Sequence, residues 1–542
     1  MTVCPDVTVI VAVYNTMPYL TECLNSLVGQ SIGPERLEVI AVDDGSTDGS
    51  GSELDRFAER YPDVVTVLRQ ANSGGPAAPS NRALDRATGR FVYFVGSDDY
   101  LGEEALERLV AYADTHGSDV VVGRMVGVGG RYVHQKLYAH NAPDISLYDS
   151  PLPFTLANTK LFRRELVEKH HLRFPEDLPV GSDQPFTIEA CVRARRISVL
   201  ADYTCYYAVR RGDSSNITYR ADHLARLRCT ARIMDHAAGL VPAGPRRDAL
   251  LARHFAWELS KLLLADFAAL DVDTRRHLCD GLSALLDAYY TDALRDSTGV
   301  RRRVRFGLAG RGAVEALTSA IADESAYGAP PFRLEGDRAF AEYPGFRDPV
   351  VGLDDRYYEV LGETVAGRLA AGTEFESADW EQQGADLWLT VRVRLGVVGD
   401  LSSAVVVLAQ GAMPPSADGP GARRMRPEDR LAQAPGEFTA AATEDGRATR
   451  IRGRVPVPAV RAKKGVRVHV DVAGAAYEIP VRTGGRPMPL ARRWGEAEPY
   501  RVAARPNTKG RLVITTAPLV ESRDGPGTRL WRLLRPKRRR SR

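Results

Sequence analysis

Two acidic clusters follow apolar runs in the first hundred residues, and each has the residue types of a ligand site. The sequence DDGSTD starts at Asp43, and the sequence GSDD ends at Asp99. The carboxylates of Asp43 and Asp44 can accept hydrogen bonds from a base imide or a ribose hydroxyl. Asp98 and Asp99 would repel each other unless a cation lay near, and a hard divalent ion that bridges to phosphate oxygens would satisfy them. A purely structural role in a turn or a helix cap is an equal alternative, because Asp and Ser favour such positions.

Three further segments carry residue types that could bind a ligand or act on it. The bend NSGGPAAPSN spans residues 72–81, and its glycines would let a ligand approach the backbone closely, although Gly and Pro also punctuate ordinary loops. The segment GSDQPF at 181–186 offers one carboxylate, Asp183, which is either a proton acceptor or the N-cap of a helix. The guanidinium fork of Arg210 or of Arg211 would fit a diphosphate, and the other would be a surface arginine.

These clusters lie at the ends of predicted strands. Apolar, β-branched runs at residues 7–13, 37–42, 64–68 and 91–95 predict strands that are buried on both faces. Stretches with helical spacing, such as 17–29, separate them. Strands that alternate with helices predict a mostly parallel sheet with right-handed crossovers. Ligands bind at the carboxyl ends of the strands in such sheets, which is where the acidic and glycine-rich clusters fall.

The pattern changes twice further along the chain. Amphipathic helical stretches predict a helical linker domain over residues 221–326. Apolar residues then alternate with polar ones between Gly, Pro and Asp signals, which is typical of antiparallel sandwiches. We therefore predict an α/β domain over 1–220, an all-β, immunoglobulin-like sandwich region of one or two modules over 327–520, and a basic tail over 521–542.

Composition narrows the class of protein. The chain has 542 residues, 73 Lys and Arg, 69 Asp and Glu, and a formal net charge of +4. Seven of the cations lie in residues 530–542, and the rest of the chain has a net charge of −3, which argues against a nucleic-acid partner. The sequence has no apolar run of about 18 residues and starts without a signal-peptide pattern, which favours a cytoplasmic protein. The six cysteines lack zinc-site spacing and are expected to be reduced, mostly buried thiols.

The order and spacing of the motifs resemble family 2 glycosyltransferases of the GT-A fold. The matching segments are VTVIVAVYN (7–15), DDGSTD (43–48), NSGGP (72–76) and SDDY (97–100), and the resemblance covers roughly residues 6–220. It implies a Rossmann-like GT-A catalytic domain, a hexosyltransferase activity and a UDP-sugar donor.

The resemblance also implies roles for individual residues. Asp98 and Asp99 would hold Mn²⁺ or Mg²⁺ on the donor diphosphate. Asp183 matches the position of the catalytic base, which takes the proton of the attacking acceptor hydroxyl. The candidates for binding the nucleotide-sugar are Val13, Tyr14, Asp43, Asp44, Asn72, Gly74, Asn81, Ser97, Arg210 and Arg211.

Three positions depart from the family's pattern. Gly96 stands where the first acid of the Asp-x-Asp element would contact the donor ribose, so that contact is missing. Ser80 stands where an arginine usually precedes the asparagine of the glycine-rich element, which puts a phosphate or base contact in doubt. Ser182 replaces an acid immediately before the base position. The metal position is kept.

The whole layout is similar to wall teichoic acid β-N-acetylglucosaminyltransferases, and residues 499–516 look like the closing strands of their carboxy-terminal region. This implies an inverting, metal-dependent transfer of N-acetylglucosamine from UDP to a hydroxyl of a cell-wall polyol-phosphate or lipid-linked glycopolymer. The alternatives are a capsule or exopolysaccharide transferase and a catalytically weak carbohydrate-binding scaffold. Assembly into a trimer through the β region is a further implication. The basic tail would either contact an anionic inner leaflet at the cell membrane or be solvated.

Overall fold

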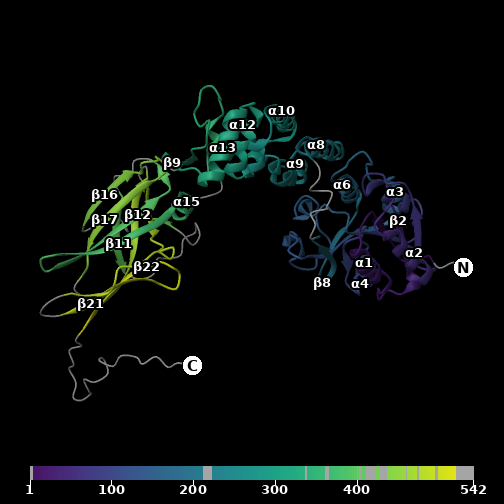
Figure 1. Cartoon of the computed structure of the whole chain (residues 1–542), viewed down its shortest axis with the longest axis horizontal. Helices are drawn as coiled ribbons and strands as arrows, with labels where there is room; N and C mark the ends of the chain where they lie inside the picture. Colours follow the sequence, from purple (N-terminus) through teal and green to yellow (C-terminus); the bar gives the residue numbers. More distant parts are fainter. Residues whose placement is uncertain are drawn as a thin grey trace, which may run out of the picture. The chain divides into compact units, whose positions relative to one another are not determined.

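A computed structural model describes residues 4–211, 222–335, 338–360, 365–398, 401, 404–410, 422–425, 436–458, 460–472, 475–494 and 499–519. The basic tail predicted at 521–542 lies outside this part of the chain. The chain divides into two compact units, Met1–Ser325 and Ala326–Arg542, which are described separately (Figure 1). Within the described residues, no helix is long and apolar enough to cross a membrane.

The first unit begins with a sheet of eight strands among the described residues. They are β1 (Val7–Val13), β2 (Leu37–Asp43), β3 (Val65–Arg69), β4 (Phe91–Gly96), β5 (Tyr100–Leu101), β6 (Val120–Val128), β7 (Leu161–Arg163) and β8 (Ile197–Val209). Their order across the sheet is β3-β2-β1-β4-β7-β6-β8-β5. The first four pair in parallel, as predicted, whereas β7 runs antiparallel to β4 and β6.

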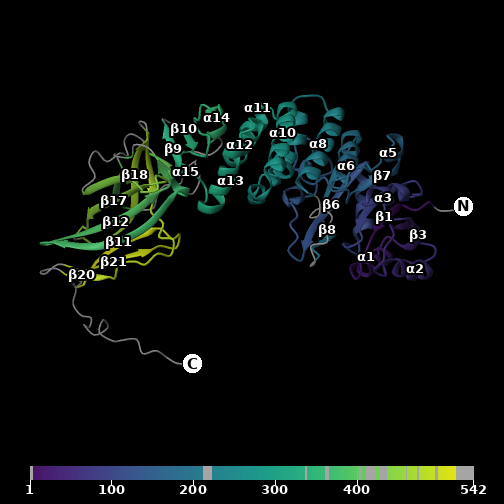
Figure 2. The same ribbon diagram turned by 45° about the horizontal axis from the view of Figure 1, so that its top comes forward.

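Helices cover both faces of this sheet, which explains why its strands are apolar throughout. Helices α1 (Tyr19–Val28), α2 (Ser50–Arg60) and α4 (Ala105–His116) share one core cluster with alternate residues of β1. Helix α6 (Asp183–Arg193) packs on the other face through Phe186, whose ring contacts that of Phe94 in β4. Figure 2 shows α6 and the short α5 (Arg164–Lys169) on the side opposite α1 and α2.

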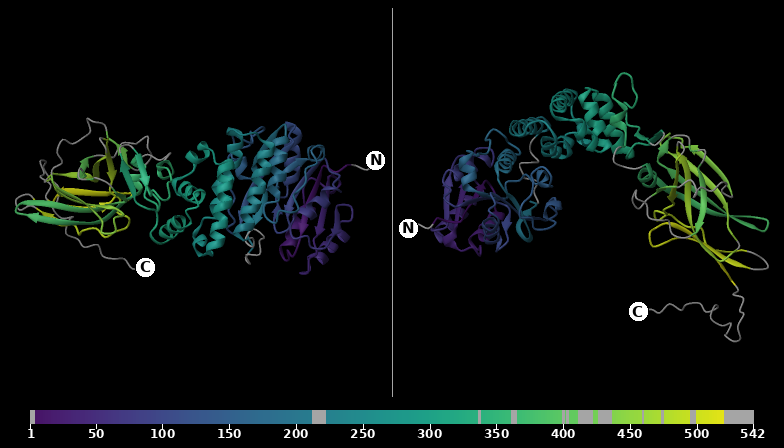
Figure 3. Two further views of the ribbon diagram at one scale, coloured as in Figure 1. Left: turned by 90° about the horizontal axis from the view of Figure 1, so that it is seen from above. Right: turned by 180° about the vertical axis from the view of Figure 1, so that it is seen from behind.

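The predicted helical linker follows and belongs to the same compact unit as the sheet. Its long helices lie side by side (Figure 3). Asp222 and Asp271 cap two of them, because their carboxylates accept the Ala225 and Thr274 amides at 2.7 and 2.8 Å. A π-helical segment, His254–Leu259, directly continues α9. The main helices are α8 (His223–Leu240), α9 (Pro245–Arg253), α10 (Val272–Tyr289), α12 (Val300–Gly310) and α13 (Val314–Tyr327).

The second unit is rich in antiparallel sheets, as the alternating pattern predicts. Among the described residues, one sheet has the order β11-β12-β17-β16, a larger one β15-β19-β18-β22-β21-β20 with β14 also paired to β18, and a small one β10-β9-β13. The strands are β9 (Phe332–Glu335), β10 (Arg338–Ala341), β11 (Thr373–Gln383), β12 (Asp386–Leu395), β13 (Val397–Val398), β14 (Val405–Gln410), β15 (Arg423–Arg424), β16 (Glu437–Ala442), β17 (Thr449–Pro456), β18 (Ala462–Val472), β19 (Ala475–Pro480), β20 (Arg492–Trp494), β21 (Tyr500–Pro506) and β22 (Leu512–Pro518).

The two larger sheets contact each other closely at one glycine. A Cβ atom on Gly453 of β17 would lie 2.3 Å from a methyl carbon of Val406 in β14, so only glycine fits there. Val406 is fully buried. The contact shows that the inner faces of the two sheets form a common core, the arrangement of a sandwich.

Candidate active site

The carboxyl ends of β1, β2 and β4 meet at one edge of the first sheet. In the parallel register, Val13 lies opposite Asp43, and Ala12 lies opposite Gly96. The two acidic clusters therefore flank the end of β1, one on each side. Tyr14 follows directly and is 44% exposed, so its ring is available for a planar ligand at this edge.

Asp43 and Asp44 are both buried, but their carboxylates are used differently. Asp43 Oδ1 accepts a hydrogen bond from the Ser46 main-chain amide at 2.9 Å. Asp44 accepts from Gln70 Nε2 at 2.7 Å and from the Ser73 hydroxyl at 2.9 Å. Asp44 thereby ties the segment after β3 to the end of β2. Of the two, Asp43 keeps more hydrogen-bonding capacity for a nucleotide.

The glycine-rich bend is folded against this edge by Asn72. The Asn72 Nδ2 donates to the Asp44 carbonyl at 3.1 Å, and its Oδ1 accepts from the Gly74 amide at 3.1 Å. A Cβ on Gly45 would lie 2.9 Å from the Asn72 nitrogen, and the φ of +77° there also requires glycine. Gly74 has no atom within 4 Å of the place where a Cβ would stand, so its backbone is open to a ligand.

Asn81 has a structural role that replaces its predicted contact with the donor. It lies in α3 (Ala77–Leu84) and is only 9% exposed. Its Nδ2 donates to the Phe174 carbonyl and to Glu176 Oε1, both at 2.9 Å, and its Oδ1 accepts from the Phe174 amide at 2.8 Å. Because both ends of the amide are engaged, Asn81 holds the segment that leads into α6 instead of facing a ligand.

The carboxylates of Asp98 and Asp99 have different surroundings. Asp99 Oδ2 accepts from the Tyr206 hydroxyl at 2.6 Å, and its Oδ1 accepts from the Val209 amide at 2.7 Å. Burial and the neighbouring Asp98 charge raise the pKa of Asp99 to about 6, against the opposing charge of Arg131. Asp99 therefore fixes its loop to β8, and the metal role of Asp98 and Asp99 stays a prediction.

The space around Gly96 is too small for the acid that the family pattern has at this position. A Cβ at this position would lie 2.9 Å from Asp99 Oδ2, 3.2 Å from Asp98 Oδ1 and 3.3 Å from the Tyr206 hydroxyl. The Gly96 amide itself donates to the Tyr206 hydroxyl at 3.0 Å. The Asp99–Tyr206 pair thus occupies the space that a larger side chain would need. The adjacent Ser97 is buried.

Arg211, and not Arg210, reaches the acidic cluster. Arg211 Nε donates to Asp98 Oδ2 at 2.7 Å, with 14% of the arginine side chain and 16% of the aspartate side chain exposed. The guanidinium carbon lies 5.9 Å from the centre of the Tyr19 ring. Arg210 is exposed. The rest of that motif, residues 212–218, lies outside the described residues.

The donor set at this edge fits a divalent ion that also binds phosphate. Among the described residues, no three His, Cys, Asp or Glu side chains are grouped so that they could hold a metal by themselves. Mg²⁺ at phosphate sites is usually held by one or two carboxylates, with substrate phosphates and water as the other ligands. Asp98, half-buried beside a cationic side chain, is a carboxylate of this kind.

Asp183 opens α6, and an aromatic cluster fixes the helix behind it. Three residues after Asp183, the Phe186 ring stacks on Phe174 with a centroid distance of 4.4 Å. It also lies edge-on to Phe162 and Phe94 at 5.3 and 5.4 Å. These rings come from different segments of the fold, so they hold the first turn of the helix in one position.

The electrostatic neighbours of Asp183 are basic and come partly from the linker. Burial raises the pKa of the Asp183 carboxyl, and the charges of Arg253 and Lys160 oppose that shift. A raised pKa suits a group that must take a proton near neutral pH. Ser182, and not Asp183, occupies the N-cap position, and its side chain makes no capping hydrogen bond. Hydrogen bonds from the backbone amides of Asp183 and Gln184 also oppose the rise in the Asp183 pKa.

Sequence reasoning missed the residues that the linker brings to Asp183. Arg253 Nη1 donates to Gln184 Oε1 at 2.9 Å, and Arg253 Nη2 lies 3.0 Å from Glu258 Oε1. Residues five apart do not share a face of an α-helix, but they are neighbours on a π-helix. The amphipathic pattern of the segment predicts only a helix, and no local signal marks the π turn.

Comparison with known proteins follows the same division of the chain. Residues 8–172 match the family model described as glycosyl transferase family 2. The chain contains a family 2 glycosyltransferase domain. Residues 223–321 match the model of the glycosyl transferase TarS linker domain. The resemblance inferred from the motifs is thus confirmed, and it extends to a TarS-type linker.

Two relatives of the family 2 domain are named as poly(ribitol-phosphate) glycosyltransferases. A poly(ribitol-phosphate) beta-glucosyltransferase of Bacillus spizizenii is 40% identical over 214 residues, which are 39% of this chain and 34% of the relative. A poly(ribitol-phosphate) beta-N-acetylglucosaminyltransferase, TarS of Staphylococcus aureus, is 43% identical over 203 residues, 38% of this chain and 35% of the relative. The aligned region spans about a third of the length of these relatives.

Solved structures of S. aureus TarS share the fold. The crystal structure of TarS aligns with a TM-score of 0.59 over 95% of this chain and 85% of that chain, at 20% identity. TarS 1–349 in complex with UDP-GlcNAc aligns with a TM-score of 0.56 over 66% of this chain and 99% of that chain, at 28% identity. The family 2 domain, the linker and the carboxy-terminal sheets therefore follow one another as in TarS.

Proposed function

We propose that this chain transfers N-acetylglucosamine from UDP-N-acetylglucosamine to a hydroxyl of a poly(ribitol phosphate) or similar polyol-phosphate polymer, with inversion at the anomeric carbon. The Asp98–Arg211 pair at the end of β4 carries the proposal, because it puts a carboxylate and a diphosphate-binding guanidinium in one place. The polymer named for both relatives supports the choice of acceptor, and the UDP-GlcNAc complex supports the choice of donor.

Different residues at this edge of the sheet would bind different parts of the nucleotide-sugar. Asp43 and the exposed Tyr14 would bind the uridine, the backbone at Gly74 would let it approach, and Arg211 would bind the diphosphate. Asp98 would hold Mn²⁺ or Mg²⁺, which when bound would neutralise the charge that develops on the leaving diphosphate.

Asp183 would act on the acceptor. Its carboxylate would take the proton of the polymer hydroxyl as that oxygen forms its bond to the anomeric carbon. The bond from the anomeric carbon to the diphosphate oxygen would break on the opposite face, and UDP would leave with that electron pair. One displacement of this kind inverts the configuration, as a β-linked product from an α-linked donor requires.

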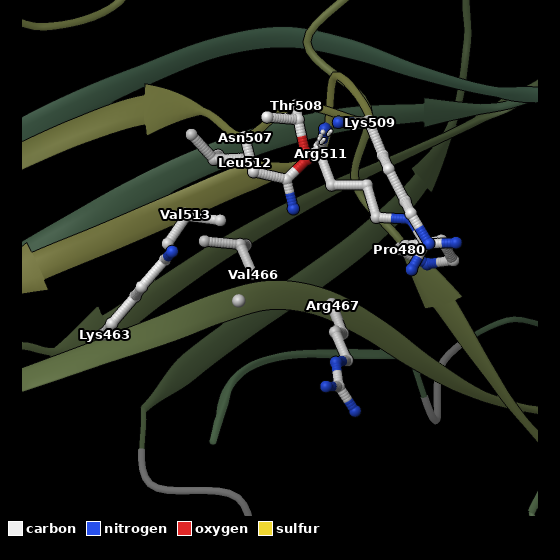
Figure 4. Close-up of a pocket in the computed structure, with 11 residues that line it drawn as sticks. Lys463, Val466, Arg467, Pro480, Asn507, Thr508, Lys509, Arg511, Leu512 and Val513 are labelled. Carbon is white, nitrogen blue, oxygen red and sulfur yellow. Dashed lines mark hydrogen bonds between the residues drawn. The ribbon is translucent and has the colours of Figure 1, made fainter. Parts of the chain in front are cut away.

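A basic pocket in the second unit supports a polyanionic acceptor (Figure 4). It measures about 350 Å³ and lies where β18 changes partner from β22 to β19. Its lining includes Lys463, Arg467, Lys509 and Arg511. Arg467 pairs with a buried acid, Glu478. Burial and the neighbouring cations Arg482 and Arg467 lower the pKa of Arg511, so the site would gain from a bound anion.

The test is UDP release from UDP-N-acetylglucosamine and UDP-glucose, with Mn²⁺ or EDTA, and with or without a synthetic ribitol-phosphate octamer. Metal-dependent release that the octamer accelerates is the expected result. A preference for UDP-glucose would reassign the donor to that of the B. spizizenii relative. Failure to bind UDP in the presence of Mn²⁺ would contradict the proposal and favour a carbohydrate-binding scaffold. Release that only a different polymer accelerates would favour a capsule or exopolysaccharide transferase.

Two predicted associations stay predictions. A trimer formed through the β region would appear as three chain masses in light scattering of the full chain. Contact between the basic tail and an anionic membrane would appear as salt-sensitive co-sedimentation with phosphatidylglycerol vesicles, lost when residues 530–542 are removed.

A further inference from the structure

The linker presents an unusual helical turn beside the proposed base. The segment His254–Leu259 is π-helical and continues α9 without a break. Such turns insert a residue into a helix and are frequent at functional sites, because they re-aim side chains that an α-helix would spread around its axis. Here the turn brings Glu258 onto the same face as Arg253.

A chain of contacts connects this turn to the start of α6. Arg253 bridges Gln184 at 2.9 Å and Glu258 at 3.0 Å. Gln184 directly follows Asp183 and is buried, and its Oε1 also lies 3.2 Å from the buried His254 Nε2. Arg253 therefore positions both Gln184 and Glu258 relative to the proposed base.

The same group holds polar atoms that lack partners within the described residues. Glu258 Oε2 and Arg253 Nε are both buried and have no hydrogen-bond partner. Their residues are not sealed in the core, since about 18% of the Glu258 side chain and 15% of the Arg253 side chain remain exposed. A buried carboxylate oxygen without a donor is rare in folded proteins and indicates a ligand or water that completes the group.

Aromatic rings line one side of this charged group. The Arg253 guanidinium carbon lies 5.2 Å from the centre of the Trp257 ring. Trp257 in turn contacts Phe154 at 5.2 Å and His134 at 5.9 Å between ring centres. All three rings are partly exposed. Rings beside a hydrogen-bonding carboxylate are the surroundings that polyhydroxylated ligands prefer, since their C–H faces pack on the rings.

The charges of Glu258 and Asp183 interact. Burial raises the pKa of the Glu258 carboxyl, and the charge of Asp183 adds to that shift, whereas Arg253 and Lys261 oppose it. The two carboxylates therefore interact electrostatically. A group that binds the acceptor next to the attacking hydroxyl would need this proximity to Asp183.

We propose that Glu258 of the linker binds the acceptor, its free Oε2 accepting a hydrogen bond from a polyol hydroxyl beside the one that attacks, while Arg253 is a positioning residue that aims Glu258 and Gln184. Trp257 would pack against the carbon chain of the same polyol unit. This inference rests on the proposed function and assigns the linker a part in acceptor recognition.

The experiment compares Glu258→Gln with the wild-type full chain. The substitution is nearly isosteric, and it replaces the accepting oxygen by an amide that donates. Two rates are measured for each protein: UDP release without acceptor, which reports the donor site, and transfer to a ribitol-phosphate octamer as a function of octamer concentration. Glu258→Ala repeats the test without the amide. Melting temperatures check that each variant is folded.

Glu324→Gln is the matched control. Glu324 is also a linker glutamate paired with arginines, at 2.8 Å from Arg305 and 3.1 Å from Arg301, and 13% of its side chain is exposed. It belongs to α13, which does not include the π turn. A general effect of removing a linker ion pair would therefore appear in both variants.

The expected result is a rise of about tenfold in the KM for the octamer in Glu258→Gln, which corresponds to one lost hydrogen bond to a charged group. The kcat, UDP affinity and acceptor-free UDP release should stay within about twofold of wild type, and Glu324→Gln should resemble wild type. An unchanged KM, or an equal loss of acceptor-free UDP release, would overturn the inference. Failure of the proposed function would instead appear in the wild-type protein, as absence of UDP binding or of any transfer.

Discussion

The Arg211 guanidinium and the Asp98 carboxylate meet at 2.7 Å, although 113 positions separate them in the chain. Arg211 follows the last strand of the first sheet and Asp98 follows its fourth, so the pair closes the donor edge from two sides. In this arrangement the two charges neutralise each other. If a divalent ion and a diphosphate bound here together, the ion would pair with the Asp98 carboxylate and the diphosphate with the Arg211 guanidinium.

Replacing Asp98 by Asn should remove the metal-dependent part of UDP binding. The carboxamide keeps the shape of the side chain but loses the charge that attracts the ion. We expect the gain in UDP affinity that Mn²⁺ produces to fall by about tenfold or more, or ~1.4 kcal/mol. Titration calorimetry with Mn²⁺ and with EDTA measures it. Asp114→Asn, at an exposed aspartate that pairs with Arg90, is the control, and equal Mn²⁺ effects in the two variants would contradict the assignment.

Replacing Asp183 by Asn should abolish transfer and spare the donor site. Loss of a general base costs about 10²–10⁴-fold in rate. UDP binding should be unchanged, because the charged side chains that shift the Asp183 pKa are Arg253 and Lys160, and neither is a candidate for binding the nucleotide. The control is Glu189→Gln, which lies on the same helix and pairs with Arg193. Full transfer by the Asp183 variant would refute its role as the base.

Replacing Phe186 by Ala should destabilise the first unit by about 3–5 kcal/mol, because its buried ring packs on three other phenylalanines and leaves a cavity when removed. The thermal unfolding transition of this unit should move to a lower temperature. Transfer activity should fall even below that transition, since the ring fixes the turn that carries Asp183. A loss of stability below about 1 kcal/mol would mean that the cluster does not hold α6.

Buried Lys160 should make stability depend on alkaline pH. Its ammonium donates to the carbonyls of Thr155 and Ala157 at 2.6 and 2.5 Å, and burial lowers its pKa to about 8, while Cys191 and Asp183 act to raise it and Arg253 acts to lower it. Between about pH 8 and 10.4 the unfolded chain holds a proton that the folded protein lacks, so the free energy of unfolding rises with pH in this window.

Lys160→Met removes that contribution. The free energy of unfolding of wild type minus that of the variant should therefore increase by about 3 kcal/mol from pH 7.5 to 10.5. Denaturant unfolding at three pH values measures the difference. Lys169→Met, at an exposed lysine of α5, shows the effect of losing a lysine at the surface. A difference for Lys160→Met that does not change with pH would contradict the prediction.

Replacing Lys463 by Ser should weaken binding of a long ribitol-phosphate polymer by about fivefold at low salt, or ~1 kcal/mol per cation near a polyanion. The effect should shrink as salt is added, because salt screens an exposed charge. Lys464→Ser is the matched control, since consecutive residues of a strand point to opposite faces and Lys464 does not line the pocket. Equal losses in the two variants would show that the pocket has no particular role.

Local sequence patterns were sufficient to predict that the acidic clusters gather at one edge of the first sheet. Buried parallel strands appear as continuous apolar runs, and their carboxyl ends meet at one edge whatever the details of packing. The positions of Asp43, Gly74 and Asp98 at this edge could therefore be predicted from strand order. The alternation in the last third of the chain predicted antiparallel sheets for the same kind of reason, because strand side chains point to opposite faces in turn.

The same patterns could not show which polar residue faces a ligand and which faces the protein. Asp99 and Asn81 have the residue types of ligand contacts, but distant segments use them: the Tyr206 hydroxyl is 107 positions from Asp99, and Phe174 is 93 positions from Asn81. Arg210 and Arg211 are adjacent arginines that the sequence does not distinguish. The direction of the chain after β8 determines that Arg211 reaches Asp98.

The sequence by itself therefore determined the order of the domains, the parallel sheet and the edge at which a nucleotide-sugar would bind, because these follow from periodicity and from the geometry of strands. Only the tertiary structure decided that Asp99 accepts hydrogen bonds from Tyr206 and Val209, that Arg211 pairs with Asp98, and that the linker brings Arg253 to Gln184, the residue after Asp183. The physical reason is that a hydrogen-bond partner is chosen by proximity in space, and a single π-helical turn or a single buried tyrosine can redirect a side chain without leaving a periodic signal in the sequence.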